Sequence, residues 1–250
     1  MNGWIFDIGE ATIHDGPGLR VTVFFKGCPL RCRWCHSPEG QHSEPEMLRL
    51  PTGDRLCGER REAGELAHYL EETAKLLGPS GGITFSGGDP LMQPEFLLEV
   101  LRSLPGIHTI VETSGFCRPS ELLRVAEHCS LIHYGLKLID ETTAKEWTGV
   151  SSRQILKTLR ALDHFSGGAE YIFRLPLLAG ITDTEENLRN LMQLSRTLHR
   201  LRHIDFLPAN TLASAKYTAC GRTFDPVCAN TATGMIPAWF APGVPWKILK

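Results

Sequence analysis

Three cysteines stand close together in the stretch K-G-C-P-L-R-C-R-W-C-H-S-P, which spans residues 26–38. They are Cys28, Cys32 and Cys35, in the spacing C-x3-C-x2-C. Three neighbouring thiols cannot all pair as disulfides, but soft thiolates can hold three corners of an iron–sulfur cube. Because such a cube has four irons, three cysteines would leave one iron without a protein ligand. The spacing therefore predicts an iron–sulfur cluster with an open coordination position at which chemistry can take place.

Zinc is the alternative metal for these thiols. A structural zinc ion usually takes its ligands as two pairs of the C-x2-C or H-x3-H kind. Cys32 and Cys35 form one such pair, but no second pair follows in the sequence. His36 is a poor fourth ligand, because adjacent residues seldom both reach one ion. The spacing favours the cluster and leaves a zinc-binding module as the alternative.

Net charge and apolar runs exclude several classes of protein. The net charge is −2 at pH 7, so the composition does not indicate the basic surface that is typical of nucleic-acid-binding proteins. No apolar run approaches the roughly 20 residues of a membrane span, and the N-terminus lacks the pattern of a signal peptide. We therefore expect a cytoplasmic protein without a membrane segment. In that compartment the eight cysteines are expected to be thiols or metal ligands rather than disulfides.

Strand-like and helix-like segments alternate along most of the chain, which predicts parallel βαβ units. Runs of β-branched and aromatic residues predict the strands, and apolar spacing of three to four residues predicts the helices. The expected strands are 20–26, 83–85, 108–113, 131–138, 171–176 and 203–207. The expected helices are 62–77, 93–104, 119–128, 141–147, 151–164 and 184–199. Six parallel strands are too few for a complete eight-stranded barrel.

The segments outside this alternation are less regular. Residues 1–19 form a lead-in that could contain an edge strand at 4–8. Residues 37–61 are polar and interrupted by prolines, which indicates a loop. Residues 225–243 are rich in proline, alanine, glycine and threonine and predict no element, whereas 244–249 could be a final strand.

Three motifs together resemble a known superfamily. The cysteine stretch with its W-C-H, the D-G-P-G-x-R sequence of residues 15–20 and the S-G-G-D of residues 86–89 are similar to the radical S-adenosylmethionine (radical SAM) enzymes. Within them, D-G-P-G resembles the glycyl radical enzyme activases, of which the pyruvate formate-lyase activating enzyme is the best-known type. The match extends to about residue 224. It implies a single domain over residues 1–250, with an open (β/α)6 partial barrel as its core at about 20–208.

The resemblance also implies a reaction and its cofactors. The open iron would bind the methionine part of S-adenosylmethionine, and an electron from the cluster would release a 5′-deoxyadenosyl radical that abstracts a glycine Cα hydrogen. The implied partners are a glycyl radical enzyme and a flavodoxin- or ferredoxin-type reductant, with the chain itself a monomer. Many activases carry a cysteine-rich insert for further clusters, but between Cys35 and Gly81 this chain has only Cys57. One [4Fe–4S] cluster is therefore expected.

Polar residues at the ends of predicted strands match the cofactor contacts of the family. Ser86, Gly87, Gly88 and Asp89 correspond to the site of the methionine amino group, although Asp89 stands where glutamate is common and the sequence could equally be a plain turn. The other implied cofactor contacts are Trp34, Glu112, Thr113, Lys137, Arg174 and Asn210.

The chain departs from the family pattern at some of these positions. The activases hold a monovalent cation with an aspartate where Glu112 stands and an acidic residue where Gly135 stands. The alternative is a buried Glu112–Lys137 ion pair without a cation. Asn210 stands where histidine is common and could be an ordinary turn residue. Arg174 lies inside a strand, where a guanidinium is costly unless it is paired or functional.

The D-G-P-G-x-R motif is assigned to the protein substrate. Its rigid turn carries little side chain, so a glycine loop of another enzyme could approach its backbone closely. The residues assigned to this role are Asp15, Gly16, Pro17, Gly18 and Arg20.

Two further functions stay open on the sequence. One is a radical SAM enzyme that acts on a small molecule, and the other is a non-catalytic electron carrier or zinc-binding module. An electron carrier would be expected to supply a fourth cysteine to its cluster. Only a radical enzyme should form 5′-deoxyadenosine when the reduced protein meets S-adenosylmethionine.

Overall fold

The computed structural model describes residues 1–78, 80–210 and 212–249. Its core is a nine-stranded sheet in the order β11-β10-β9-β8-β7-β6-β2-β1-β5. All neighbours from β2 to β11 pair in parallel, whereas β1 is antiparallel to both β2 and β5. The strands of this sheet are β1 (Asn2–Thr12), β2 (Arg20–Phe25), β5 (Glu59–Glu62), β6 (Gly82–Gly87), β7 (Thr109–Thr113), β8 (Leu131–Tyr134), β9 (Glu170–Leu177), β10 (Leu201–Pro208) and β11 (Trp246–Ile248).

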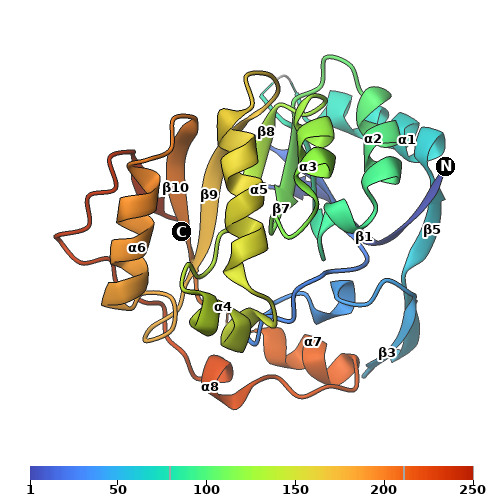
Figure 1. Ribbon diagram of the computed structural model, residues 1–250. Coiled ribbons are helices and arrows are strands. Elements are labelled where there is room, and N and C mark those ends of the chain that lie inside the picture. The colour runs from blue at the N-terminus through green and yellow to red at the C-terminus, as the bar shows by residue number, and fades with distance from the viewer. Residues whose placement is uncertain (79, 211, 250) are drawn as a thin grey trace.

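Helices follow the parallel strands. In Figure 1, α1, α2, α3, α5 and α6 cover one face of the sheet, while α4, α7 and α8 lie at one end of it. The helices are α1 (Ala63–Leu76), α2 (Pro94–Arg102), α3 (Pro119–Ala126), α4 (Glu141–Thr148), α5 (Ser152–His164), α6 (Glu185–Ser195), α7 (Ala213–Ala219) and α8 (Pro226–Ala229), with the short 3-10 turns η1 (Pro38–Gly40) and η2 (Pro90–Met92). The predicted α/β fold, with six parallel strands of a partial barrel, is confirmed as β2 and β6 to β10.

Apolar alternation explains how the layers meet. Val21, Val23 and Phe25 of β2 are fully buried in the main core. The Phe25 ring packs edge-on against Phe85 of β6 at 6.0 Å and against Phe96 of α2 at 5.7 Å. Such ring pairs add to the burial of apolar area that stabilises a sheet beneath its helices.

The prediction of a loop over 37–61 was wrong. The segment contains a hairpin of β3 (Glu46–Leu50) and β4 (Gly53–Cys57), followed by β5, which pairs with β1. The inward residues Leu48 and Cys57 are buried against Ala219 of α7, and this contact stabilises a polar segment with little propensity of its own.

Other boundaries also differ from the expected ones. β8 ends at Tyr134 instead of 138: the Gly135 amide still bonds to the Thr113 carbonyl of β7, but the Leu136 amide turns back to the Tyr134 carbonyl. β1 extends to Thr12, beyond the expected edge strand. The tail contains α7 and α8, which the sequence did not indicate, and β11, which it did.

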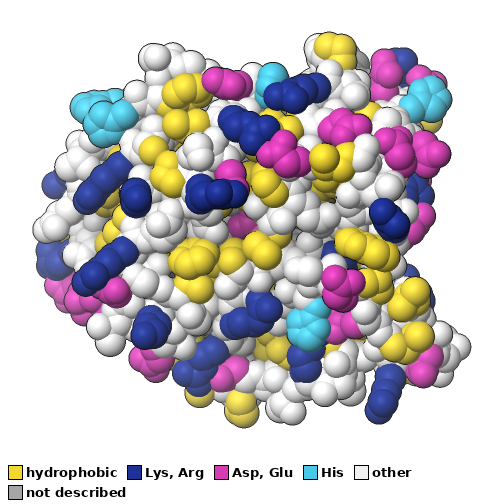
Figure 2. Space-filling view, turned by 45° about the vertical axis from the view of Figure 1, so that its right-hand side comes forward, with side chains coloured by type: hydrophobic (Ala, Val, Ile, Leu, Met, Phe, Trp, Pro, Cys, Tyr) yellow, Lys and Arg dark blue, Asp and Glu magenta, His cyan; other side chains and the backbone are white. Residues whose placement is uncertain are grey.

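The surface is mixed in charge. On the face shown in Figure 2, lysine and arginine side chains alternate with aspartate and glutamate. Among the helices of the described residues, none combines the length and apolar character needed to cross a bilayer.

Candidate functional site

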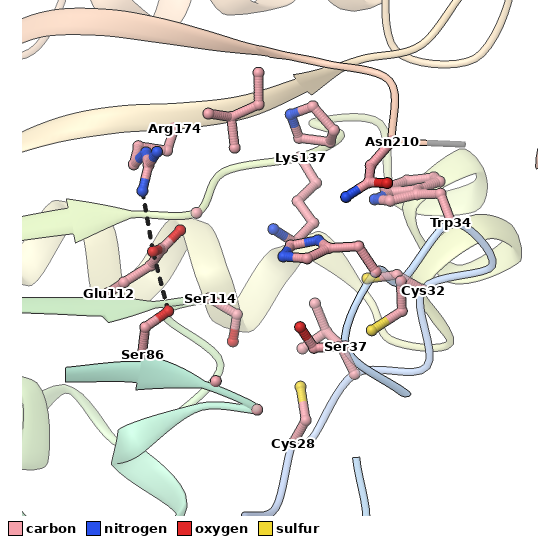
Figure 3. A pocket seen from close by; sticks show the side chains of 18 of the residues that line it. Cys28, Cys32, Trp34, Ser37, Ser86, Glu112, Ser114, Lys137, Arg174 and Asn210 are labelled. Carbon is pink, nitrogen blue, oxygen red and sulfur yellow. Dashed lines mark hydrogen bonds and ion pairs between the residues drawn. The ribbon is translucent and has the colours of Figure 1, made fainter. Parts of the chain in front are cut away.

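A cavity of about 410 Å³ opens where the parallel strands end. Function in parallel α/β folds gathers at this edge, because the loops after successive strands converge there. Figure 3 shows side chains from these loops pointing into the space. The sequence-predicted residues that line it are Asp15, Cys28, Cys32, Trp34, Cys35, Ser86, Gly87, Gly88, Glu112, Thr113, Lys137, Arg174 and Asn210.

The cysteine loop is held from two sides. Cys28 donates its amide to the Gln41 carbonyl at 3.1 Å, beyond η1. Arg31 donates its amide to the Thr148 carbonyl of α4 at 2.7 Å. Arg33 packs over the Trp147 ring at 4.3 Å. Backbone and stacking contacts therefore fix the path of the loop without using the thiols.

The spacing of the thiols argues against a single zinc ion. Tetrahedral zinc with Zn–S bonds of about 2.3 Å brings its sulfurs to about 3.8 Å from one another. Within the part of the chain that the structure describes, the one set of three potential ligand atoms that all lie within 4.8 Å of each other is His68, Glu71 and Glu72. The three cysteine sulfurs thus do not all lie within the distance that one zinc ion requires, which is compatible with a cluster that gives each thiolate its own iron.

Burial also shapes the chemistry of these thiols. It raises the pKa of all three, to about 12 for Cys32, because surroundings poor in water disfavour a bare thiolate. A bound metal centre reverses this preference, since its positive charge stabilises the thiolate that it binds. The loop therefore suits a metal centre better than a free nucleophile.

Gly87, the last residue of β6, and Gly88, which follows it, bring the end of this strand against β2 and the start of the cysteine loop. Gly87 has φ +101°, and a Cβ there would lie 2.5 Å from the Phe25 amide nitrogen. A Cβ on Gly88 would lie 2.2 Å from the Gly27 carbonyl oxygen. Only residues without side chains permit this approach, which leaves backbone groups facing the cavity.

Asp89 does not point into the cavity. Its carboxylate is 2% exposed and accepts hydrogen bonds from the Thr113 hydroxyl at 2.9 Å and the Ser114 hydroxyl at 2.6 Å. It also accepts the amides of Ser114 and Leu91. Asp89 is therefore not oriented for the direct cofactor contact that the sequence predicted. Its carboxylate oxygens instead join the ends of β6 and β7.

Glu112 pairs with Arg174 and not with Lys137. Glu112 Oε2 accepts from Arg174 Nη1 and from the Ser86 hydroxyl, both at 3.1 Å (Figure 3). Burial opposes ionisation of this carboxyl, but the charges of Arg174, His133 and Lys137 lower its pKa to about 2. The alternative of a Glu112–Lys137 ion pair was wrong, and the strand arginine is the partner.

A prediction of pH dependence follows from Glu112. Because its pKa falls from 4.5 to about 2 on folding, ionised Glu112 stabilises the fold by about 3 kcal/mol above pH 4.5. That stability is lost as the pH falls from 4.5 towards 2. Urea unfolding of wild-type and Glu112→Gln apoprotein should therefore differ most near pH 6 and converge only as the pH approaches 2. A difference that stays constant over this range would contradict the assignment.

The loop before β2 reaches the cavity through its first residues. The Asp15 carboxylate accepts from the Thr22 hydroxyl at 2.9 Å, and the Asp15 carbonyl accepts from the Thr84 hydroxyl at 2.9 Å. Arg174 Nη2 donates to the His14 carbonyl at 2.9 Å. The loop is thus joined to the barrel interior and to the same arginine that binds Glu112.

Arg20 is not part of an exposed substrate loop. Its side chain is fully buried and donates to the Thr84 hydroxyl and to the carbonyls of Pro17, Ile83 and His108. The expectation that Arg20 meets the protein substrate was therefore wrong. The guanidinium instead fastens the turn of the loop to the neighbouring strands.

The two remaining predicted contacts lie at opposite depths. Trp34 is buried beside the cysteines, with its ring 6.1 Å from that of Trp147. Asn210 lies at the exposed rim, and its Oδ1 accepts the Leu212 amide at 3.0 Å. This bond is typical of a turn residue, although Asn210 also lines the cavity.

Several lining residues were not predicted. His36 follows Cys35 directly, so its position beside the cluster motif was the signal that could have found it. Phe224 and Cys228 come from the irregular tail, where no pattern pointed inward. Cys228 is 4% exposed and packs in the same apolar cluster as Cys32 and Trp34.

Comparison with known families decides the assignment. A family model described as the Radical SAM superfamily matches residues 22–192. The chain belongs to the radical SAM superfamily. Radical SAM enzymes use a [4Fe–4S] cluster and S-adenosylmethionine, and the residues here fit both. The three thiols, which all line the cavity, suit the cluster, and the cavity volume is in the usual range for a small-molecule site.

Its relatives within the superfamily are activating enzymes. The isethionate sulfite-lyase activating enzyme of Oleidesulfovibrio alaskensis is 32% identical over 88% of this chain and 87% of that protein. The choline trimethylamine-lyase activating enzyme of the same organism is 31% identical, over 91% and 90%. A domain of a pyruvate-formate lyase-activating enzyme from Bacteroides vulgatus has a similar fold, with a TM-score of 0.52 and 24% identity over 68% of this chain and all of that one. The resemblance to the glycyl radical enzyme activating enzymes is thereby confirmed.

Proposed function

We propose that this radical SAM enzyme activates a glycyl radical enzyme by removing a hydrogen atom from a glycine Cα of that partner. The observation that carries the proposal is the meeting of three motifs at one cavity: the cysteine loop, the glycines after β6, and Asp15 of the D-G-P-G sequence. A cavity that brings the candidate cofactor residues together with the first residue of a loop of small residues suits a backbone substrate.

Each group of residues has a role in this proposal. Cys28, Cys32 and Cys35 hold the cluster. When bound, the cluster and S-adenosylmethionine supply one-electron chemistry that forms 5′-deoxyadenosine and takes a hydrogen atom from carbon. The chain itself binds, orients and shields these groups. The residues that face the cofactor are Trp34, Ser86, Gly87, Gly88, Glu112, Thr113, Lys137, Arg174 and Asn210, with Asp89 holding two of their strands together.

The partner loop would enter beside residues 13–19. Pro17 and Gly18 are exposed there, so a glycine loop could approach the backbone at Gly18 while it packs against the exposed apolar side chains of Ile13 and Leu19. The proposal includes an external one-electron donor of the flavodoxin or ferredoxin kind, a monomeric cytoplasmic protein, and one domain over residues 1–250. The site residues lie at the ends of strands of one continuous sheet or in the loops that follow them, which supports the single domain.

The test is anaerobic and has two readouts. Cluster-reconstituted protein is reduced, mixed with S-adenosylmethionine and supplied with a glycyl radical enzyme encoded beside it. 5′-Deoxyadenosine is measured by chromatography, and the glycyl radical by electron paramagnetic resonance. The same partner with its loop glycine replaced by alanine is the matched control.

We expect 5′-deoxyadenosine with either partner and the protein radical only with the glycine-containing one. Formation of 5′-deoxyadenosine without a protein radical on any glycyl radical enzyme would favour action on a small molecule. Absence of 5′-deoxyadenosine from cluster-loaded, reduced protein would leave an electron carrier as the better account.

A further inference from the structure

The segment after β10 returns to the cysteine loop. Its helix α7 lies against η1 and β3, at the end of the sheet where the loop runs (Figure 1). Tyr217 and Phe224 of this segment pack in the same apolar cluster as Cys32 and Trp34. Residues far apart in the chain therefore form one wall around the thiols, and a polar group of that wall can act on the metal centre that the thiols hold.

Arg222 joins this segment to the cysteine loop. Its Nη1 donates to the Pro38 carbonyl at 3.0 Å and to Gln41 Oε1 at 3.1 Å. Its Nη2 pairs with Glu46 Oε2, and Glu46 Oε1 lies 3.2 Å from the fully buried ammonium of Lys26. Because both oxygens of Glu46 are engaged, the guanidinium is held in one position.

The contact with Arg222 decides which way the Gln41 amide points. A guanidinium has only donors, so the Gln41 atom that faces it must be the oxygen, and the NH2 group is left to face the other side. Gln41 is 7% exposed, and its backbone carbonyl accepts the Cys28 amide at 3.1 Å. The residue is thus fixed at its backbone by the cysteine loop and at its side chain by Arg222.

The sulfur of Cys35 is the second neighbour of the Gln41 side chain. Burial raises the pKa of the Cys35 thiol, and hydrogen bonds from the Ser37 backbone and the Gln41 side chain oppose this rise. A donor that favours the thiolate also favours added negative charge on a metal centre bound to that sulfur. Hydrogen bonds to the sulfurs are among the factors that set the reduction potential of an iron–sulfur cluster.

We propose that Gln41, oriented by Arg222, donates its amide hydrogen to the Cys35 thiolate and thereby raises the reduction potential of the cluster. Reduction adds one electron from the external one-electron donor, and no bond forms or breaks. The added charge is unfavourable in buried, apolar surroundings, and the amide dipole offsets part of that penalty. Both residues are positioning residues, since they act through Cys35. The inference rests on the proposed function, because it takes the cysteine loop as the cluster site.

The first test measures the midpoint potential of the cluster. Gln41→Met keeps most of the side-chain volume and the net charge but has no N–H. We expect about tenfold less reduced cluster than in wild type at the same ambient potential, which is a midpoint about 59 mV more negative for a one-electron couple. Cluster-loaded proteins are titrated anaerobically without S-adenosylmethionine and followed by electron paramagnetic resonance. A midpoint equal to that of wild type, in Gln41→Met protein with a full cubane, would overturn the inference.

Gln154→Met is the matched control. Gln154 lies on α5, outside the cavity, and its Nε2 donates to the Cys117 carbonyl at 2.6 Å. This variant therefore also loses a glutamine hydrogen bond, but not one beside the cysteine loop, and its midpoint should agree with that of wild type. Equal shifts in Gln154→Met and Gln41→Met would show a general effect of packing and would count against the inference.

The second test asks whether Arg222 acts through the glutamine. Arg222→Lys keeps the positive charge, but one ammonium cannot take over the contacts to Pro38, Gln41 and Glu46 together. We expect a more negative midpoint in Arg222→Lys and no further shift when this change is added to Gln41→Met. An unchanged midpoint in Arg222→Lys, or shifts that add in the double variant, would refute this role. Arg222→Lys alone decides the outcome if Gln41→Met does not hold a full cluster.

Cluster content and product formation separate this inference from the proposed function. Iron and sulfide are measured in every protein, and 5′-deoxyadenosine is measured after S-adenosylmethionine is added. A wild-type cubane that yields product, together with unchanged midpoints in the variants, would overturn the inference alone. Wild-type protein that holds zinc in place of a cubane would count against the proposed function itself. Shifted midpoints together with wild-type product support both.

Discussion

Cys32→Ala protein, reconstituted and reduced without oxygen, should hold no intact cubane and form no 5′-deoxyadenosine. Cys32 is 8% exposed and lies in the middle of the loop that the Gln41 and Thr148 carbonyls fix in place. Two remaining sulfurs would leave two of the four irons without a protein ligand, which is too few thiolates to hold an intact cube. Iron and sulfide analysis with Mössbauer spectroscopy measures the cluster, and chromatography measures the product.

The control for this change is another cysteine of the chain. Cys129 lies at the edge of the main core, away from the cavity, so Cys129→Ala should keep cluster and activity. Cys228 lines the cavity and could supply a replacement sulfur, so Cys32→Ala is also made together with Cys228→Ala. A full cubane and product formation in this double variant would refute the assignment of the cysteine loop.

The parallel strands could be predicted because their sequences leave few alternatives. A strand buried on both faces needs a run of β-branched and aromatic residues, which β2 has and which few helices would have. The β3–β4 hairpin could not be predicted in this way. Its polar residues alternate weakly, and its burial depends on α7, which lies more than a hundred residues further along the chain.

The sequence places the site residues at the correct edge of the sheet, but it does not predict which way their side chains point. Asp89 follows β6, as expected, yet its carboxylate turns to the end of β7, where it accepts hydrogen bonds from the Thr113 and Ser114 hydroxyls. For Arg20 a signal existed in the sequence. Residues two apart on a strand share a face, so Arg20 and Thr22 point to the barrel interior together, away from any partner.

The pairing of Glu112 shows what a sequence cannot decide. The sequence suggested Lys137 as the partner, and only the distances identify Arg174 instead, which reaches Glu112 at 3.1 Å. The choice leaves Lys137 without a protein partner among the described residues. Arg174 therefore belongs to a structural ion pair, whereas Lys137 remains open to a ligand.

Arg174→Met should destabilise the protein by about 3–5 kcal/mol, the usual cost of removing one partner from a buried ion pair. The Arg174 side chain is 6% exposed and the Glu112 side chain 24%, so the carboxylate left behind would be poorly solvated. One effect opposes the loss: Arg174 Nε is buried without a hydrogen-bond partner, and removing it recovers about 1–3 kcal/mol at most. The loss of the Glu112 and His14 contacts outweighs it. Chemical denaturation at pH 7 measures the net change.

A double variant separates the pair from simple packing. Arg174→Met with Glu112→Gln removes both charges, so it should be more stable than Arg174→Met alone and recover about half of the loss. Arg174→Lys keeps the charge, but one ammonium cannot take over both guanidinium contacts, to Glu112 and to the His14 carbonyl. Hydrogen exchange at residues 13–19 should therefore rise in Arg174→Lys while the fold stays intact. Equal stability of Arg174→Met and the double variant would show that packing of the arginine, and not its charge, holds this loop to the site.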